Sequence, residues 1–396
     1  MKNRLVMKFG GSSLATPEKI RKAAQVIISR KKDYNDVVIV VSAMGKTTNE
    51  LIAKANELSD CPAEREMDML MSTGEMVSSS LMSMHLQSLG YKSVALTGFQ
   101  AGFETTGSHT VAKIKNVNAN RLNAELKDGK IAVVTGFQGI DEKNDITTLG
   151  RGGSDTSAVA IAAVLSARCE ILTDVNGIYS IDPRIRPTAK KIDCISYQET
   201  MEMANLGAKV LEPRSVEMAE KYGVELFVGL NTGDLDGTTI LKEEEIVEQN
   251  LITNISKKDD VLLVSISQKD KKDFAIADAL TKLAQNDVNI DMINRLSEKG
   301  EIYYTITTNY ASKTRVQEVL AKMSLDSEFH ENLSKVSIIG SAMRNQVGVA
   351  ARAFAVISNK QIQFYEVSTS EISISYLVEK DKGDILVNAF ADEFGL

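Results

Sequence analysis

Apolar runs that alternate with helical segments constrain the fold of this chain more than any other feature of its sequence. The runs are rich in Val, Ile and Leu, and segments such as 49–58, 66–89 and 155–166 between them have helical periodicity. This alternation predicts an α/β fold with a mainly parallel sheet that helices cover on both faces. The expected buried strands are LVMKF (5–9), DVVIVVS (36–42), KSVALTG (92–98), KIAVVTG (130–136), RCEILTD (168–174) and VELFVGL (224–230).

Glycine-bearing loops follow several of these strands. Ligands of open α/β sheets bind beyond the carboxyl ends of the strands, so we expect these loops to share one site. The glycines are Gly10, Gly11, Gly45, Gly98, Gly136, Gly150, Gly152 and Gly153.

Composition and charge narrow the possible functions. A chain of 396 residues with 43% hydrophobic content can form two or three soluble domains. No apolar run is long enough to span a membrane, and the N-terminus lacks a signal-peptide pattern, so we expect a cytoplasmic protein with no membrane association. The formal net charge of −7 also argues against a nucleic-acid-binding protein.

Cysteine and histidine residues are too few and too scattered to indicate a disulfide framework, a metal site or a histidine-based hydrolytic triad. We therefore expect no protein-bound metal, and we expect the thiols to be buried. The residues concerned are Cys61, Cys169, Cys194, His85, His109 and His330.

Lys8 interrupts the first predicted strand, where an unpaired ammonium group would be costly to bury. Its tip must therefore reach a polar site. Gly10 and Gly11 allow the backbone to approach a ligand, Ser12 adds a hydroxyl group, and the helix beginning near Pro17 points its N-terminus at the same place. The segment predicts an anion site suited to phosphate. The alternative is a surface lysine beside an ordinary glycine turn.

TTLGRGGSDTSA, residues 147–158, is the strongest chemical motif. Its glycines permit a tight turn that would hold Arg151 at a helix entrance, where the guanidinium group can bind a carboxylate through two hydrogen bonds. Asp155 can orient Arg151 or bind an amino group; an exposed arginine beside a capping aspartate is the alternative. The chain lacks the GxGxxG and GxxxxGK[ST] patterns, which disfavours a Rossmann dehydrogenase or a P-loop enzyme.

Three further segments supply polar groups. STGE places Glu75 at a helix entrance, where an acid is equally expected as a helix opener. Two further cations, Lys209 and Arg184, would act together with Lys8 to neutralise a transferring phosphoryl group. TDVNGIYSIDPR, which also has the composition of an ordinary turn, offers a nucleotide the side chains of Thr173, Asp174, Tyr179 and Arg184.

The acidic run LKEEEIVEQN, residues 241–250, marks a predicted domain boundary. Beyond it VLLVSI corresponds to KVSIIG, and EIYYTITT to EISISYLV, so the sequence predicts two βαββ units. Such units act either as small-ligand sensors or as structural dimerisation modules. The predicted domains are 1–245, 250–330 and 331–396.

Eight segments, in order along nearly the whole chain, resemble those of the aspartate kinases of the amino acid kinase family. The resemblance implies the amino acid kinase fold followed by two ACT domains. It also implies ATP-dependent phosphorylation of the β-carboxylate of L-aspartate, the first step toward lysine, threonine, methionine and diaminopimelate. The segments are KFGGSS, VVSAMGKTTN, STGE, TGFQAG, GRGGSDTSA, TDVNGIY with DPR, GAKVLEPRS and STSEISIS.

The resemblance further implies a role for each matched residue. Lys8 would neutralise the transferring phosphoryl group. Glu75 would hold the α-ammonium group of aspartate and Arg151 its α-carboxylate, while Asp155 would support both contacts. The aspartate pocket would also include Ser42 and Thr48. The nucleotide, ATP carrying Mg²⁺, would be held by Lys8, Gly10, Gly11, Ser12, Thr173, Asp174, Tyr179, Arg184 and Lys209.

Departures from the family pattern bear on regulation. Glu212 stands where the family usually has histidine, at a position to which we assign no chemistry. SISQKDKKDFA in the first ACT unit lacks the usual aspartate-to-glycine turn, whereas the second unit keeps SIIGSAMRNQVGVAARAF. We expect feedback regulation by lysine, threonine or both, and a homodimer or larger homo-oligomer formed through the ACT units.

Other amino acid kinases act on glutamate, acetylglutamate, carbamate or nucleoside monophosphates, and the STGE and GRGGSD motifs with the ACT tail disfavour them. A protein of a different class, a catalytically silent amino-acid-binding regulatory subunit, is the second hypothesis. The presence of Lys8, Glu75, Arg151 and Asp155 argues against it.

Overall fold

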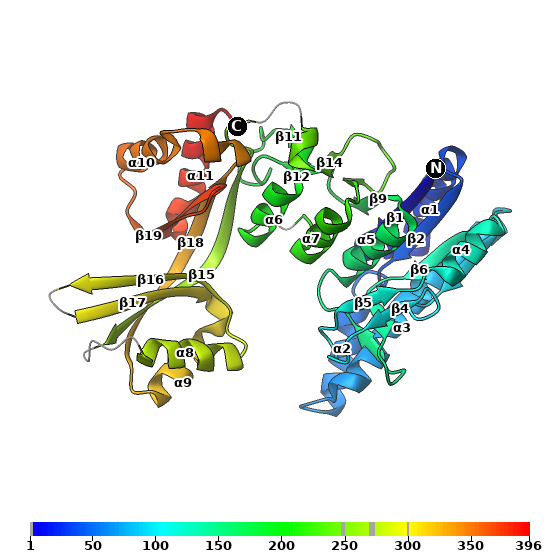
Figure 1. The fold of residues 1–396 in the computed structure, drawn as a ribbon, viewed down its shortest axis with the longest axis horizontal. Coiled ribbons are helices and arrows are strands. Elements are labelled where there is room, and N and C mark those ends of the chain that lie inside the picture. The colour runs from blue at the N-terminus through cyan, green and yellow to red at the C-terminus, as the bar shows by residue number, and fades with distance from the viewer. Residues whose placement is uncertain (1–2, 209, 247–249, 269–273, 299–300) are drawn as a thin grey trace. The chain divides into compact units, whose positions relative to one another are not determined.

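The computed structural model describes residues 3–208, 210–246, 250–268, 274–298 and 301–396. The chain forms two compact units, which Figure 1 shows as ribbons. Unit 1 comprises 1–179, 191–204 and 209–248, and unit 2 comprises 180–190, 205–208 and 249–396. The two short segments 180–190 and 205–208 of unit 2 are not evident from the sequence. The further division of the C-terminal part at residue 331 stays a prediction.

Unit 1 is built on an eight-stranded sheet, here called sheet A, in which all neighbours are parallel except β13 and β14. All six predicted strands are present in it. Their apolar runs are largely buried, as expected for strands covered on both faces, while Val94 and Ala95 in the edge strand β3 are half-buried. In spatial order the strands are β12 (Cys194–Ser196), β14 (Thr238–Leu241), β13 (Leu226–Leu230), β9 (Arg168–Thr173), β1 (Arg4–Phe9), β2 (Asp36–Val41), β6 (Ile131–Thr135) and β3 (Ser93–Leu96).

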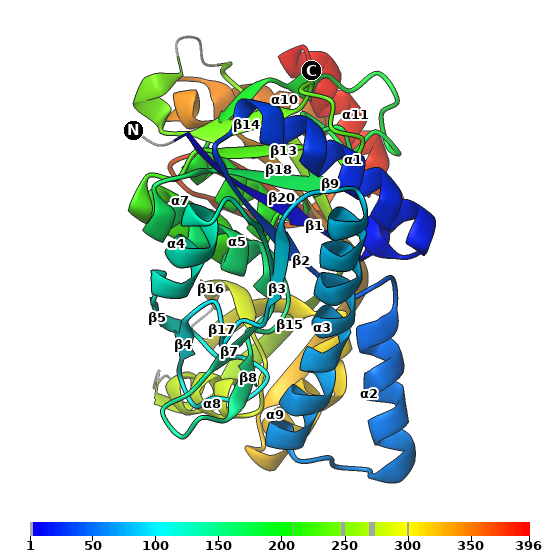
Figure 2. The same ribbon diagram turned by 90° about the vertical axis from the view of Figure 1, so that its right-hand side faces the viewer.

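Helices surround sheet A, and the three helices predicted from periodicity are confirmed as α2, α3 and α5. The first helix begins as expected, because Thr16 Oγ1 accepts a hydrogen bond of 3.3 Å from the Lys19 amide and Pro17 follows the cap. In Figure 2 the long helix α3 lies beside α2 and along the sheet. The helices are α1 (Pro17–Asp33), α2 (Thr47–Leu58), α3 (Glu64–Ser88), α4 (Asn120–Lys127), α5 (Gly153–Leu165), α6 (Tyr197–Asn205) and α7 (Pro213–Tyr222), with short 3-10 turns at Gly11–Leu14 and Glu243–Glu245.

Two smaller sheets complete unit 1. The first has the order β5-β4-β7-β8, and its strand β8 packs against α3. The second pairs β10 with β11. The strands are β4 (Phe103–Thr105), β5 (Ile114–Val117), β7 (Gln138–Ile140), β8 (Ile146–Thr148), β10 (Ile178–Tyr179) and β11 (Lys191–Ile192).

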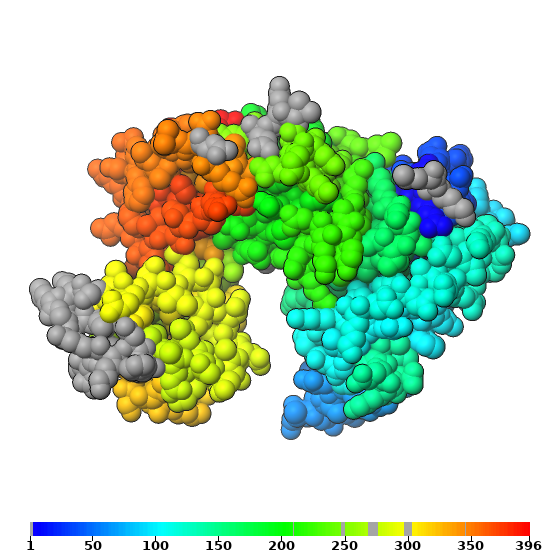
Figure 3. All heavy atoms as spheres, viewed as in Figure 1, coloured from blue at the N-terminus to red at the C-terminus, as the bar shows by residue number. Residues whose placement is uncertain are grey.

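Unit 2 contains the predicted βαββ repeat twice. One antiparallel sheet, ordered β16-β17-β15-β18-β20-β19, joins the two copies through the long strands β15 and β18. Each copy has its own apolar core, and Figure 3 shows their surfaces in yellow and in orange to red. The first copy has β15 (Asn254–Gln268), α8 (Phe274–Gln285), β16 (Ile290–Glu298), β17 (Glu301–Asn309) and α9 (Lys313–Lys322). The second has β18 (Asp326–Ile339), α10 (Val349–Asn359), β19 (Phe364–Thr369), β20 (Ser373–Glu379) and α11 (Lys380–Phe394), and 3-10 turns lie at Tyr310–Ser312 and Ser341–Asn345.

Within the described parts of the chain, no helix has both the length and the apolar character needed to cross a membrane.

A buried ion pair fixes α1 on sheet A and gives a test of the fold. Arg30 Nε lies 3.1 Å from Glu170 Oε2, with side-chain exposures of 8% and 1%, and Arg30 Nη2 donates to the Gly233 carbonyl. Replacing Arg30 by Met leaves the Glu170 carboxylate buried without its charge partner, so we expect a loss of about 3–5 kcal/mol in the free energy of unfolding.

Denaturant titration measures this loss. The matched control is Lys22→Met on the same helix, whose partner Glu18 is 2.9 Å away but whose side chain is 74% exposed; it should leave the unfolding curve unchanged. Equal curves for the two variants would contradict the structural role of the buried pair.

Candidate active site

The carboxyl ends of neighbouring strands bring most of the predicted site residues to one edge of sheet A. Strands β9, β1 and β2 are adjacent and parallel. Lys8 lies one residue before the end of β1, Ser42 directly follows β2, and Thr173 ends β9. The shared site that the glycine loops predict therefore has a structural basis at this edge.

Lys8 and Asp155 form an ion pair at the centre of this edge. Lys8 Nζ lies 2.6 Å from Asp155 Oδ1, and each side chain is 13% exposed. Asp155 lies in the first turn of α5, where the helix dipole favours a negative charge. The lysine side chain thus leaves a strand whose neighbouring residues Met7 and Phe9 are fully buried and reaches a polar partner.

The loop after β1 is held close to the loop after β2. A Cβ atom on Gly11 would lie 2.7 Å from the Ala43 carbonyl oxygen, so a larger residue cannot replace this glycine without moving the backbone. The Ser12 carbonyl accepts a hydrogen bond of 2.7 Å from Lys19 Nζ. Ser13 Oγ accepts a hydrogen bond of 2.8 Å from Asn231 Nδ2. Asn231 is absent from the sequence-based site, although its place directly after a predicted strand could have indicated it.

Glu75 occupies a different place from the one that the sequence predicts. It lies in the middle of α3 and not at a helix entrance. Gly74 allows this, since a Cβ atom there would lie 2.8 Å from the Ala43 side chain. The expectation was wrong because Ser-Thr-Gly resembles a helix start, whereas here the small glycine lets α3 pack against the loop after β2.

The Glu75 carboxylate is buried, and only one of its two oxygen atoms has a hydrogen-bond partner. Its side chain is 3% exposed, and Oε1 accepts 2.9 Å from the Ala43 amide. Oε2 has no hydrogen-bond partner among the described residues. Burial raises the pKa of Glu75 to about 7. The open oxygen atom is a place where a cation such as an ammonium group would be stabilised.

Arg151 lies in a loop shaped by glycine. Gly150 and Gly152 adopt φ angles of 76° and 64°, in the left-handed region that favours glycine. A Cβ atom on Gly152 would meet the Glu212 side chain at 2.4 Å, so Glu212 packs directly on this loop. The Arg151 side chain is exposed and makes no hydrogen bond or ion pair with any residue that the structure describes, although its charge acts on the nearby Glu212. It is available to bind an anion.

Glu212 lies closer to the predicted site residues Arg151 and Asp155 than the sequence indicated. Burial and the nearby negative charge of Asp155 raise its pKa, while Arg151 and Arg214 act in the opposite direction. A carboxylate at this position therefore contributes to the electrostatics around Arg151.

The remaining predicted residues are placed as follows. Thr48 lies in the first turn of α2. Thr173 Oγ1 donates 3.1 Å to Asp174 Oδ1, and half-buried Tyr179 ends β10. Arg184 lies in unit 2, where its Nη2 donates 2.6 Å to Asp182 Oδ2. Lys209 lies outside the described residues.

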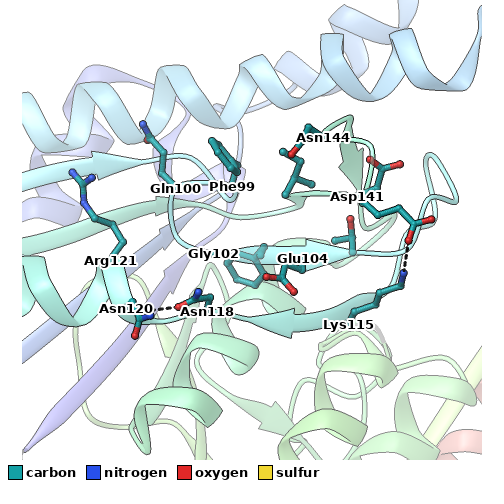
Figure 4. A pocket seen from close by; sticks show the side chains of 14 residues that line it. Phe99, Gln100, Gly102, Glu104, Lys115, Asn118, Asn120, Arg121, Asp141 and Asn144 are labelled. Carbon is teal, nitrogen blue, oxygen red and sulfur yellow. Dashed lines mark hydrogen bonds and ion pairs between the residues drawn. The ribbon is translucent and has the colours of Figure 1, made fainter.

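Unit 1 also has a groove of about 600 Å³ on the small sheet that contains β4 and β5, shown in Figure 4. Charged and polar side chains line it, including Lys115, whose Nζ lies 3.9 Å from Glu142 Oε2. None of the predicted site residues lines this groove.

Comparison with known proteins decides the family. The model of the amino acid kinase family matches residues 3–230, and an ACT domain model matches residues 336–394. Aspartokinase of Geobacillus stearothermophilus is 44% identical over 99% of this chain and 97% of its own length. Aspartokinase 2 of Bacillus subtilis is also 44% identical, over 99% of this chain and 98% of its own.

This chain belongs to the aspartokinases of the amino acid kinase family. Its fold agrees with that assignment: the structure of Escherichia coli aspartokinase III in complex with aspartate and ADP has a TM-score of 0.82, covering 99% of this chain and 100% of that chain. The sequence identity in that comparison is 24%, so it concerns the fold alone. The fold class predicted from the sequence is confirmed.

The raised pKa of Glu75 predicts how its replacement changes stability with pH. The pKa is about 7 in the folded protein, against the ordinary value of 4.5 for a glutamate side chain. Between these values the folded state binds more protons than the unfolded state, so stability falls as pH rises. Glu75→Gln removes this effect. We expect the variant to gain up to about 3 kcal/mol relative to wild type at pH 8 and nothing at pH 4.

Denaturant unfolding at pH 4, 6 and 8 measures the difference. Glu125 is the control, because its hydrogen bond with Lys130 lowers its pKa. Its stabilising effect is present at neutral pH and lost in acid, so Glu125→Gln should destabilise the protein at pH 8. The same pH dependence in both variants would show that Glu75 is not held in a desolvated state.

Proposed function

We propose that this chain transfers the γ-phosphoryl group of ATP to the β-carboxylate of L-aspartate and forms 4-phospho-L-aspartate and ADP. The observation that supports this most directly is a set of charged side chains around the Lys8–Asp155 pair that lack an interaction partner. Glu75 has a buried carboxylate oxygen without a partner, and Arg151 has an exposed guanidinium group without one, within the described residues. An α-amino acid carries the two complementary charges on one carbon atom.

In this proposal Glu75 and Arg151 hold the head group of aspartate. The α-ammonium group completes Glu75 Oε2, and the α-carboxylate accepts two hydrogen bonds from Arg151. Ser42 and Thr48 line the pocket from the loop after β2 and from the start of α2. Because the ammonium group stabilises the ionised form of Glu75, substrate binding restores an ordinary pKa to that carboxyl group.

Phosphoryl transfer then needs charge neutralisation and little else. The β-carboxylate of aspartate is ionised at neutral pH and can attack the γ-phosphorus atom without a general base. As the new P–O bond forms, the bond to the bridging oxygen breaks and ADP leaves with that electron pair. Lys8 stabilises the charge on the transferred group, and Asp155 orients the Lys8 side chain in the free protein.

The nucleotide would lie along the ends of β1 and β9. The residues assigned to it in unit 1 are Gly10, Gly11, Ser12, Thr173, Asp174 and Tyr179. Arg184, which belongs to unit 2, and Lys209, which lies outside the described residues, are assigned to the nucleotide from the sequence alone. In the described part of the chain, no group of three or more His, Cys, Asp or Glu side chains could form a metal site. Mg²⁺ bound to the phosphates of ATP would neutralise phosphate charge.

Regulation and location complete the proposal. Escherichia coli aspartokinase III has also been described in complex with lysine and aspartate in a T-state. We propose that lysine, threonine or both inhibit the present enzyme through its ACT units, that the chain forms a homodimer or larger homo-oligomer, and that it works in the cytoplasm. Its product would supply the biosynthesis of lysine, threonine, methionine and diaminopimelate.

The deciding experiment traps the acyl phosphate. Purified protein is incubated with MgATP and hydroxylamine, and aspartyl hydroxamate is measured with aspartate, with glutamate, and with aspartate plus lysine or threonine. Product that depends on aspartate is expected. No product from any acceptor, combined with amino-acid binding, would instead favour a catalytically silent regulatory subunit.

Replacing Lys8 by Met should lower kcat by about a thousandfold or more, because the transferred phosphoryl group loses its stabilising charge. Lys22→Met, an exposed lysine on α1, is the control and should behave as wild type. Hydroxamate formation under saturating substrates measures kcat, and circular dichroism checks the fold. A folded Lys8→Met variant with more than a tenth of wild-type kcat would remove the assigned role.

Replacing Arg151 by Ala should act chiefly on aspartate. The loss of two charge-assisted hydrogen bonds corresponds to a rise in the KM for aspartate of about ten- to a hundredfold, with the KM for ATP nearly unchanged. Arg151→Lys should recover only part of the affinity, because an ammonium group cannot form the paired contact. A parallel rise in both KM values would contradict a specific contact with the amino acid.

A further inference from the structure

A second buried carboxylate on α3 has partners that all lie near the Arg151 loop. Asp68 is fully buried. Its Oδ1 accepts from Thr148 Oγ1, its Oδ2 lies 2.9 Å from His109 Nδ1, and the Thr110 amide donates to both oxygen atoms at 3.1 and 3.0 Å. The carboxylate therefore ties α3 to two other chain segments, around residues 109–110 and at the end of β8.

One segment continues along the chain into the Arg151 loop, and the other packs against that loop. Thr148 is the last residue of β8 and precedes Arg151 by three positions. The Thr110 carbonyl lies against Gly150, where an added Cβ atom would be 3.2 Å from it. Figure 2 shows β8 beside α3, in agreement with their packing. Asp68 thus fixes the strand that enters the Arg151 loop and the segment on which that loop lies.

The same helix carries Glu75. Asp68 and Glu75 are seven residues apart, which is about two helical turns, and both side chains are buried. The rigid helix α3 therefore carries two groups. One is Glu75, the carboxylate assigned to the substrate ammonium group. The other is Asp68, which anchors the loop that holds Arg151, the residue assigned to the substrate carboxylate.

The loop itself needs such an anchor, because left-handed glycines at 150 and 152 leave its backbone free to adopt other conformations. A second anchor comes from α7. Arg214 Nη1 donates 3.1 Å to the Leu149 carbonyl, and its Nη2 donates 3.1 Å to the Ala112 carbonyl. The loop is thus held by Asp68 from one helix and by Arg214 from another.

We propose that Asp68 is a positioning residue that sets the distance between Arg151 and Glu75 and thereby the affinity for the head group of the amino acid. This inference rests on the proposed function. Asp68 is itself fully buried, and both of its carboxylate oxygen atoms bind protein groups. It therefore acts through Arg151 and not on the substrate. The two charges of the substrate share one carbon atom, so a small displacement of the loop breaks one of the two contacts.

Asp68→Asn and Thr148→Val test the proposal. The first keeps the shape of the side chain and replaces one acceptor by an amide NH₂ group, and the second removes only the hydroxyl group that donates to Asp68. We expect the KM for aspartate to rise at least tenfold in Asp68→Asn and several-fold in Thr148→Val, with kcat and the KM for ATP within a factor of about three. Should Asp68→Asn fail to fold, Thr148→Val carries the test.

Glu125→Gln is the matched control. Glu125 is another buried carboxylate of unit 1, 6% exposed, with Arg121 and Lys130 at 2.6 and 2.5 Å. Its replacement perturbs a buried carboxylate whose ion-pair partners Arg121 and Lys130 lie outside the Arg151 loop. It should leave the KM for aspartate unchanged, which separates positioning from a general loss of stability.

A double-mutant cycle gives a readout that a merely structural role would not move. If Asp68 acts through Arg151, then Asp68→Asn in an Arg151→Ala background should raise the KM for aspartate no further. Fully additive effects, or an unchanged KM in both single variants, would overturn the positioning role. Wild type is assayed in parallel: an absence of aspartyl hydroxamate from wild type would overturn the proposed function itself.

Discussion

The ion pair between Lys8 and Asp155 is the interaction on which the arrangement of the site depends. A lysine in a central strand of a buried sheet requires a partner, and the partner at 2.6 Å comes from the first turn of α5. The N-terminus of α5 must therefore lie over the end of β1. This explains the close packing of Gly136 against Ser154, where an added Cβ atom would lie 2.8 Å from the serine side chain. It also explains the tight glycine turn that brings the chain from β8 into the helix.

Around this ion pair the protein holds two further charged side chains, Glu75 and Arg151, that lack an ion-pair partner among the described residues. Glu75 is desolvated with one open oxygen atom, and burial raises its pKa to about 7. A carboxyl group in this state costs the free protein stability at neutral pH, and an ammonium group placed at the open oxygen recovers that free energy. Arg151 has the opposite condition, since it remains hydrated until an anion arrives. Under the proposed function, the free protein is thus complementary in charge to the head group of an α-amino acid.

The sequence predicted those parts of the structure that depend on local patterns. The buried strands are continuous apolar runs, and Gly10 and Gly11 follow the first of them. Arg151 lies between glycines whose left-handed backbone makes a tight turn. Glu75 was misplaced because a glycine inside a helix resembles a boundary. Here Gly74 is small for a tertiary reason, its contact with Ala43. Asp68 could not be assigned a function from pattern alone, because its partners are more than 40 residues away along the chain.

The rigidity of the head-group contacts also bears on the choice of acceptor. If Glu75 and Arg151 fix the α-carbon of the substrate, the length of the substrate side chain decides where its carboxylate lies. Only one length then places the carboxylate next to the phosphoryl group near Lys8. Glutamate, with one more methylene group, would bring its carboxylate to a position shifted by roughly one bond length, and a misplacement of about 1 Å can cost a hundredfold in rate. Discrimination of this kind works only if the two contacts cannot adjust. The anchoring of the flexible glycine loop by Asp68 and Arg214 is therefore as relevant to acceptor choice as the residues that touch the substrate.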